Sequence, residues 1–221
     1  MQKDTDSSTE VSDSEEAISY YSNELETISQ LSKPSQEQIQ EKLCFLGEKT
    51  KKVTLVLDLD ETLAHSTEAN ITNYGAIQIS TTIRPYAVTL LEKMSKKYEI
   101  VVFTAADEKY AKEVIKILDP KGIWIKKLVA SEHCITLDNS IMVKDLRIFA
   151  DRELNKMLIV DNSIFSFAFQ LANGIPVSSF TGEGDDEELS YLIDYLDDLY
   201  KSEDIVQENA KNMRLTCGDT N

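Results

Sequence analysis

Two aspartates lie one residue apart, directly after an apolar run, in the segment VTLVLDLDETL at residues 53–63. At the mouth of a buried strand, Asp58 and Asp60 would repel each other and lose hydration, so they need a positive charge between them or a proton on one of them. A magnesium ion, which prefers oxygen ligands, meets this need. The spacing therefore predicts a metal-dependent site.

Further polar groups follow apolar runs elsewhere in the chain. They are Thr62, Thr104 in EIVVFT, Lys144 in VKDL, and the pair Asp161 and Asn162 in MLIVDN. Parallel strands end at one edge of their sheet, where ligands of such sheets bind, so we expect these groups to converge. Carboxylates, hydroxyls and one amine around magnesium are typical of a phosphate site.

Each group then has a chemical role in phosphoryl transfer. Asp58 can attack phosphorus as a carboxylate and form an aspartyl-phosphate, and Asp60 can protonate the leaving oxygen and later activate water. Lys144, Thr104 and Thr62 can hold the phosphoryl oxygens. Taken singly, a threonine or lysine at a strand end is more often structural, so the prediction depends on the whole set.

The surrounding sequence alternates between buried strands and amphipathic helices. Apolar strands separated by helices indicate a mostly parallel, doubly wound α/β sheet covered on both faces. Ahead of it, the spacing predicts helices over about 18–32 and from Ser35, where Gln38 completes a capping box. These two helices either pad the core or bind a partner. The predicted strands are 53–58, 99–104, 157–161 and 175–180, with short apolar runs at 123–130 and 134–143, and the predicted helices are 85–97, 108–118 and 186–200.

The motifs DLDETL, FTA, VKDL and VDNS together resemble those of FCP/SCP-type phosphatases in the haloacid dehalogenase superfamily. That group includes the small phosphatases that act on the C-terminal domain of RNA polymerase II. The resemblance covers roughly residues 50–200, including the segment FAFQLANGIPV at 167–177. It implies a Rossmann-like fold and a magnesium-dependent phosphoserine or phosphothreonine phosphatase.

The resemblance also implies the metal ligands. These are the Asp58 carboxylate, the backbone carbonyl of Asp60 and the Asn162 side chain, with Asp161 as a further ligand or as the partner of one. Against the family pattern, residues 66–83 form a shorter segment than the strand-rich insertion that grips a proline of the polymerase repeat.

The intervals between motifs bear on substrate size. Thr62 to Thr104 and Thr104 to Lys144 each span about 40 residues and must already supply helix and strand, so no large cap domain fits. An open site admits a phosphorylated side chain, which predicts a phosphorylated protein as the substrate. The alternative is a catalytically silent scaffold with this fold that binds phosphoproteins, and the intact set of polar groups favours the enzyme.

Charge divides the chain into a neutral middle and two acidic ends. The net charge is −16, of which residues 51–182 contribute none. Bases gather between Lys93 and Lys127, either on surface helices or as a rim for an acidic partner. Without a basic face, direct nucleic-acid binding is not expected. With no membrane-length apolar run and three scattered cysteines, we expect an intracellular protein of the nucleus or cytoplasm.

We therefore expect four parts. Residues 1–34 would be a largely disordered acidic extension with one amphipathic helix, and residues 35–50 a leading helix. Residues 51–200 would be the phosphatase domain, and residues 201–221 a flexible acidic tail. Deleting 186–200 should abolish folding, whereas deleting 203–221 should be neutral.

Overall fold

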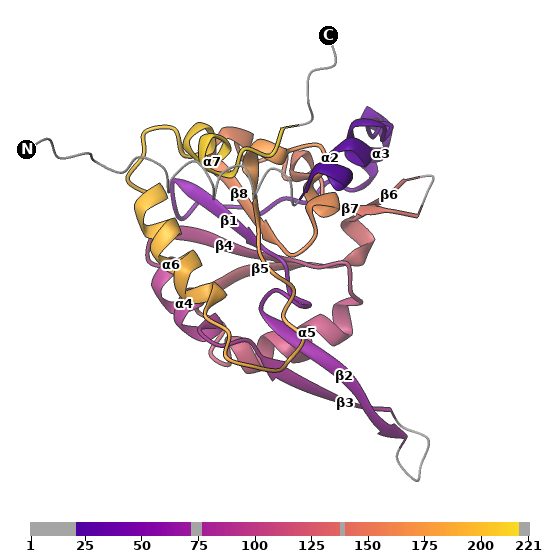
Figure 1. The fold of residues 1–221 in the computed structure, drawn as a ribbon, viewed down its shortest axis with the longest axis vertical. Coiled ribbons are helices and arrows are strands. Elements are labelled where there is room, and N and C mark those ends of the chain that lie inside the picture. Colours follow the sequence, from indigo (N-terminus) through magenta and orange to yellow (C-terminus); the bar gives the residue numbers. More distant parts are fainter. Residues whose placement is uncertain (1–20, 72–76, 138–139, 217–221) are drawn as a thin grey trace, which may run out of the picture.

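The computed structural model describes residues 21–71, 77–137 and 140–216, and its centre is a five-stranded parallel sheet (Figure 1). The strand order is β5-β4-β1-β8-β9, so the chain builds outward from β1 in both directions. This confirms the predicted doubly wound α/β fold. The strands are β1 (Val53–Leu57), β4 (Tyr98–Phe103), β5 (Ile125–Val129), β8 (Met157–Asp161) and β9 (Gly174–Pro176).

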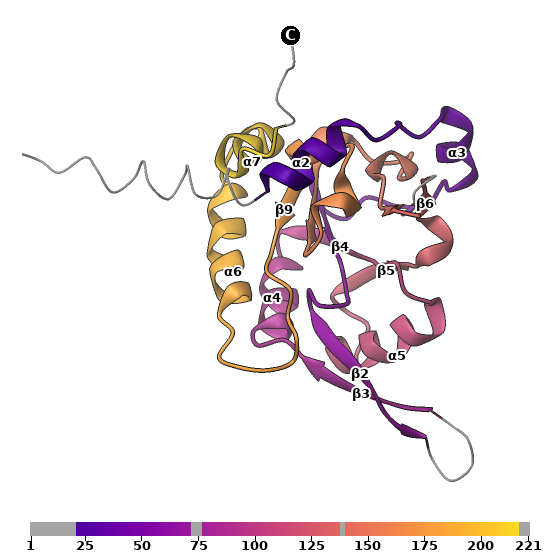
Figure 2. The same ribbon diagram turned by 45° about the vertical axis from the view of Figure 1, so that its right-hand side comes forward.

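Helices cover one face of the sheet, while short helices and 3-10 turns cover the other. On the first face, α4 and α6 pack against each other, as Figure 2 shows. No helix of the described residues is long and apolar enough to cross a membrane. The first face carries α4 (Ala87–Met94), α5 (Glu108–Leu118) and α6 (Glu188–Leu199); the second carries α2 (Ser22–Ser29) and α3 (Gln36–Glu41). The 3-10 turns are η1 (Ser131–His133), η2 (Leu146–Ile148), η3 (Leu154–Lys156), η4 (Ile164–Phe167) and η5 (Leu171–Asn173).

Strand β1 is buried throughout because it lies between two cores. Leu55 and Leu57 point into the core under α4, α5 and α6, whereas Val56 points into the core under α2 and the 3-10 turns. All three side chains are fully buried. Burial of each such side chain stabilises the fold by about 1.5–3 kcal/mol, so β1 is firmly fixed and ends at a defined point.

The two helices before the sheet pad the core. The predicted capping box is present: Gln38 N donates to Ser35 Oγ at 3.2 Å, and Ser35 N donates to Gln38 Oε1 at 2.9 Å. Leu25, Ile28 and Ile39 are buried in the second core. Residues 1–20, which include most of the expected disordered extension, lie outside the described residues.

A β-hairpin occupies the segment for which the sequence predicted no element. Strands β2 (Ala64–Ile71) and β3 (Ile77–Ile83) pair antiparallel and project from the body of the fold (Figures 1 and 2). A smaller hairpin joins β6 (Ile135–Thr136) and β7 (Met142–Val143). Between Thr62 and Lys144, the described residues add these two hairpins to the alternating strands and helices. Neither hairpin is a large cap domain, in agreement with the predicted fold.

The expectation of a flexible tail after residue 200 is wrong for part of it. Helix α7 (Ile205–Met213) packs against η5 and β9. Its Asn209 is fully buried and donates to the carbonyl oxygens of Ala172 and Gly174, each at 2.9 Å. A polar side chain anchors this helix, so apolar periodicity gave little sign of it.

We predict that Asn209→Ala destabilises the protein by about 1–3 kcal/mol, because two buried carbonyls lose their donor. Urea unfolding monitored by circular dichroism measures the change. Lys211→Ala on the same helix removes only an exposed side chain and should change stability by less than about 0.5 kcal/mol. Equal effects of the two substitutions would contradict a structural role for α7, as would unchanged stability after truncation at Ser202.

Candidate active site

The carboxyl edge of the sheet gathers the predicted site residues around the end of β1. Asp58 follows β1, Thr104 follows β4, and Asp161 is the last residue of β8. Strands β4 and β8 flank β1 on either side. This is the point where the strand order reverses, which is where doubly wound folds hold their ligands.

Lys144 lies between two aspartates from neighbouring strands. Its ammonium donates to Asp58 Oδ1 and, at 2.6 Å, to Asp161 Oδ2. All three side chains are almost fully buried. Burial lowers the pKa of Lys144, but the charges and hydrogen bonds of the two carboxylates raise it further, so its pKa lies above the ordinary value. The lysine is therefore a permanent buried cation.

The second aspartate of this pair is held from two sides. Asp161 Oδ1 accepts a hydrogen bond from the backbone N–H of Ser163 at 2.9 Å, while its Oδ2 accepts from Lys144. Burial raises the pKa of Asp161 to about 6, although Lys144 acts in the opposite direction. Both oxygens thus have protein donors, and the main contact of Asp161 is the lysine.

Thr62 connects Asp58 with the end of β8. Its hydroxyl lies 2.8 Å from Asp58 Oδ2 and 3.4 Å from Asn162 Oδ1. The Asn162 amide group donates to Ser179 Oγ at 2.9 Å and to Glu61 Oε2 at 3.2 Å, which fixes the amide oxygen toward Thr62. A carboxylate oxygen and an amide oxygen therefore face the same hydroxyl.

Asp60 has neutral hydrogen-bond partners, in contrast with Asp58. Thr104 Oγ1 donates to Asp60 Oδ2 at 3.2 Å, and the Tyr110 hydroxyl donates to Asp60 Oδ1. Burial and the nearby charge of Asp58 raise the pKa of Asp60 above its ordinary value, despite these hydrogen bonds. Burial and the contact with Asp60 raise the pKa of Tyr110 to about 12, so the phenol keeps its proton. Such an environment favours the protonated carboxyl that a general acid needs.

The loop after Asp58 owes its shape to a buried arginine. Arg84, which follows β3, has a fully buried side chain and pairs with Asp186 through two contacts of 2.9 and 3.0 Å. The same guanidinium donates to the carbonyl oxygens of Thr62 at 3.3 Å and Ser178 at 2.8 Å. Arg84 thus ties the loop after Asp58 to the chain that follows β9.

A strained residue lies within this loop. Glu61 has φ of 61°, in the left-handed region that is uncommon for residues other than glycine. Its carbonyl accepts a hydrogen bond from Phe180 N at 2.7 Å, and its N–H donates to the Ala64 carbonyl at 2.7 Å. These contacts hold the turn that places Asp60 and Thr62 beside Asp58.

The structure brings every predicted site residue to one place. Lys144 and Thr62 contact Asp58, Thr104 contacts Asp60, and Asn162 and Asp161 lie at the adjoining strand end. The sequence reasoning did not assign Tyr110 or Arg84 to the site. Tyr110 lies in the first turn of the helix after Thr104, a position that points back to the strand end, and this spacing was the available signal.

The oxygen atoms at this edge fit the predicted magnesium ion in kind. Within the described residues, no group of three His, Cys, Asp or Glu side chains is arranged to hold a metal. The fit depends instead on oxygen ligands of three kinds: the Asp58 carboxylate, the Asn162 amide oxygen and the backbone carbonyl of Asp60. The first two lie close together, because both face the Thr62 hydroxyl. Few protein ligands, all oxygen, are typical of magnesium sites that keep several waters.

Fold and site together define a Rossmann-like α/β protein with an aspartate and lysine centre at the switch point of its sheet. The family model of NLI interacting factor-like phosphatases matches residues 53–206, about two thirds of the chain. The chain belongs to this family. Its predicted resemblance to FCP/SCP-type phosphatases is therefore confirmed.

Individual relatives agree with this assignment. The CTD small phosphatase-like protein 3 of Caenorhabditis elegans is 37% identical over 177 residues, which are 74% of this chain and 61% of that protein. The human carboxy-terminal domain RNA polymerase II polypeptide A small phosphatase 2 is 36% identical over 176 residues, 73% of this chain and 64% of that protein. The chain thus spans less than two thirds of either relative. The solved structure of Fcp1, an essential RNA polymerase II CTD phosphatase, aligns over 83% of this chain and 57% of its own with 21% identity and a TM-score of 0.47.

We predict that Arg84→Met destabilises the protein by about 3–5 kcal/mol, because Asp186 and several carbonyls lose their buried partner. Lys97→Met is the matched control, since Lys97 pairs with Asp197 at 2.8 Å near the surface and should contribute at most about 1 kcal/mol. Urea unfolding of both variants tests this. Similar effects of the two substitutions would show that Arg84 does not hold the loop.

Proposed function

We propose that the protein is a magnesium-dependent phosphatase that dephosphorylates serine or threonine residues of proteins through an aspartyl-phosphate. The observation that carries this proposal is the difference between the two aspartates. Asp58 contacts a buried ammonium and a hydroxyl, whereas Asp60 contacts two hydroxyls and has a raised pKa. Paired carboxylates in such different surroundings suit a nucleophile beside a general acid.

The first step transfers the phosphoryl group to the protein. A carboxylate oxygen of Asp58 forms a bond to phosphorus while the bond to the serine or threonine oxygen breaks, and Asp60 gives its proton to that oxygen. Lys144 offsets negative charge next to the attacking carboxylate. Lys144 and Thr62 orient Asp58 before the phosphoryl group binds, and the Thr62 hydroxyl can then turn from Asp58 to a phosphoryl oxygen.

The second step releases inorganic phosphate. Asp60, now ionised, takes a proton from water as that water attacks phosphorus, and the bond between phosphorus and the Asp58 oxygen breaks. Tyr110 and Thr104 keep the Asp60 carboxyl directed at the site in both steps.

A magnesium ion held by Asp58, the Asp60 carbonyl and Asn162 would neutralise charge on the phosphoryl group. We assign Asp161 chiefly as the partner of Lys144, whose ammonium lies 2.6 Å from Asp161 Oδ2. Loss of Asp161 should therefore act through the position of Lys144.

The open carboxyl edge supports a protein substrate. Asp60 and Asn162 are partly exposed, and the β2–β3 hairpin projects away from the body of the fold (Figure 1). The human relative is named a small phosphatase of the carboxy-terminal domain of RNA polymerase II polypeptide A, which is a protein. We extend to this chain only the class of substrate, a phosphoserine or phosphothreonine of a protein.

Hydrolysis of p-nitrophenyl phosphate tests the proposal. We expect turnover with magnesium, loss of turnover with EDTA, and a decrease of roughly a thousandfold or more in Asp58→Asn, because the nucleophile is removed. Asp198→Asn removes a surface carboxylate and should leave the rate unchanged. Absence of turnover in folded, magnesium-supplied protein would favour the silent scaffold, and activity of Asp58→Asn equal to that of the unchanged chain would exclude this nucleophile.

A further inference from the structure

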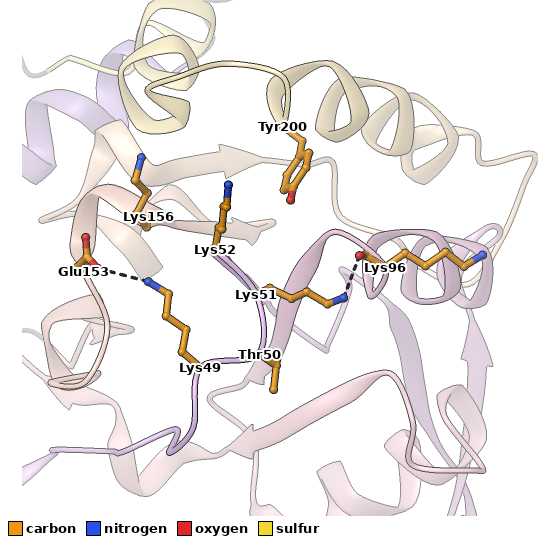
Figure 3. Close-up of a pocket in the computed structure, with 8 residues that line it drawn as sticks. All are labelled: Lys49, Thr50, Lys51, Lys52, Lys96, Glu153, Lys156 and Tyr200. Carbon is orange, nitrogen blue, oxygen red and sulfur yellow. Dashed lines mark hydrogen bonds and ion pairs between the residues drawn. The ribbon is translucent and has the colours of Figure 1, made fainter.

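A pocket rich in lysine lies outside the site described above. Its volume is about 680 Å³, and Figure 3 shows the residues around it. Five lysines and a single glutamate, Glu153, line it together with Thr50 and Tyr200. We refer to it as the lysine pocket, and its lysines are Lys49, Lys51, Lys52, Lys96 and Lys156.

The lysine pocket lies at the amino-terminal edge of the sheet. Lys52 directly precedes β1, Lys96 lies two residues before β4, and Lys156 directly precedes β8. Parallel strands begin at one edge and end at the other, so these lysines face away from Asp58. Six residues of extended chain separate Lys52 from Asp58, roughly 20 Å. The lysine pocket is thus distinct from the candidate active site.

Few acidic groups neutralise these lysines. Lys49 pairs with Glu153 at 3.3 Å, across a contact that is well exposed to solvent. Lys51 donates to the Lys96 carbonyl at 3.0 Å, and Lys156 to the Glu203 carbonyl at 3.4 Å. Lys52 has no hydrogen-bond or ion-pair partner within the part of the chain that the structure describes.

One lysine of the pocket is directed elsewhere. Of the lysines between Lys93 and Lys127, five pair with a carboxylate within 4 Å, and Lys96 is the one of these five that also lines the lysine pocket. Its ammonium pairs with Glu92 and extends away from the other lysines in Figure 3. The ammonium groups available in the lysine pocket are therefore those of Lys49, Lys51, Lys52 and Lys156.

Tyr200 adds a neutral donor. Its ring packs edge-on against Tyr98, with centroids 5.2 Å apart, which fixes its direction. Its hydroxyl has no hydrogen-bond partner among the described residues, and in Figure 3 it points toward the lysines. The lysine pocket thus contains hydrogen-bond donors from one fixed phenol and four ammonium groups. Its lining contains one carboxylate, that of Glu153.

We propose that the lysine pocket binds a compact anion that carries several phosphate groups. Lysine binds phosphate as a point charge, and several ammonium groups around one volume suit an anion with several charges. The volume lies in the range of small-ligand sites. Five lysines and one glutamate line this pocket, whereas the whole chain has a net charge of −16, so the pocket is a local concentration of positive charge. This binding is separate from the proposed phosphatase reaction.

Calorimetric titration of the full chain with inorganic tripolyphosphate, without divalent cations, tests the proposal. We expect saturable binding of one tripolyphosphate, and clearly weaker binding of inorganic phosphate. Lys52→Gln combined with Lys156→Gln should weaken tripolyphosphate binding roughly tenfold or more. Lys112→Gln combined with Lys116→Gln removes the same charge from α5 and should change the affinity little.

Three results would overturn the proposal: no saturable binding, equal weakening by both double variants, or no weakening by Lys52→Gln with Lys156→Gln. A measurement on the unchanged chain covers the case in which this variant misfolds. Tripolyphosphate should protect Lys49, Lys51, Lys52 and Lys156 from acetylation, read by mass spectrometry, while Lys112 and Lys116 react as before. Protection of all these lysines alike, or of none, would contradict a specific pocket. Activity of the variants toward p-nitrophenyl phosphate reports separately on the phosphatase proposal.

Discussion

The buried ion triad of Lys144, Asp58 and Asp161 is the constraint on which the carboxyl edge of this protein depends. Taking charges out of water costs several kcal/mol for each ion, and only close partners offset that cost. The triad therefore requires β1 and β8 to stay in register and Lys144 to reach across both strand ends. A sheet that is apolar on both faces meets this requirement, because its packing leaves the strand ends no freedom to separate.

Contacts around the triad position the side chains to which we assign chemical roles. Arg84 and the left-handed turn at Glu61 fold the loop after Asp58 back on itself, which sets Asp60 and Thr62 on either side of the first aspartate. Tyr110 and Thr104, from the next helix and strand end, then fix Asp60. Asp58 thus contacts the ammonium of Lys144, whereas Asp60 contacts the hydroxyls of Tyr110 and Thr104. The difference in function that we propose for Asp58 and Asp60 thus follows from the neighbours that the fold gives each of them.

The sequence predicted what depends on apolar patterning and missed what depends on buried polar contacts. The strands around Asp58, Thr104 and Asp161 were correctly located because each is a continuous apolar run. Helix α7 was missed because Asn209 anchors it through hydrogen bonds, and the β2–β3 hairpin because β2, with the sequence AHSTEANI, is mostly polar and contains no apolar run. The lysine pocket was missed for another reason: Lys49, Lys51 and Lys52 are close in sequence, but Lys96 and Lys156 join them only where parallel strands begin.

The most direct test of this account is to trap the phosphorylated aspartate. Asp60→Asn should form the intermediate from p-nitrophenyl phosphate, whose leaving group needs little acid catalysis, but should hydrolyse it slowly for lack of a base. After rapid acid quench, borohydride reduction converts an acyl phosphate on aspartate to homoserine, which mass spectrometry can locate. We expect homoserine at residue 58. Release of p-nitrophenol without modification at Asp58, or with modification at another residue, would contradict it.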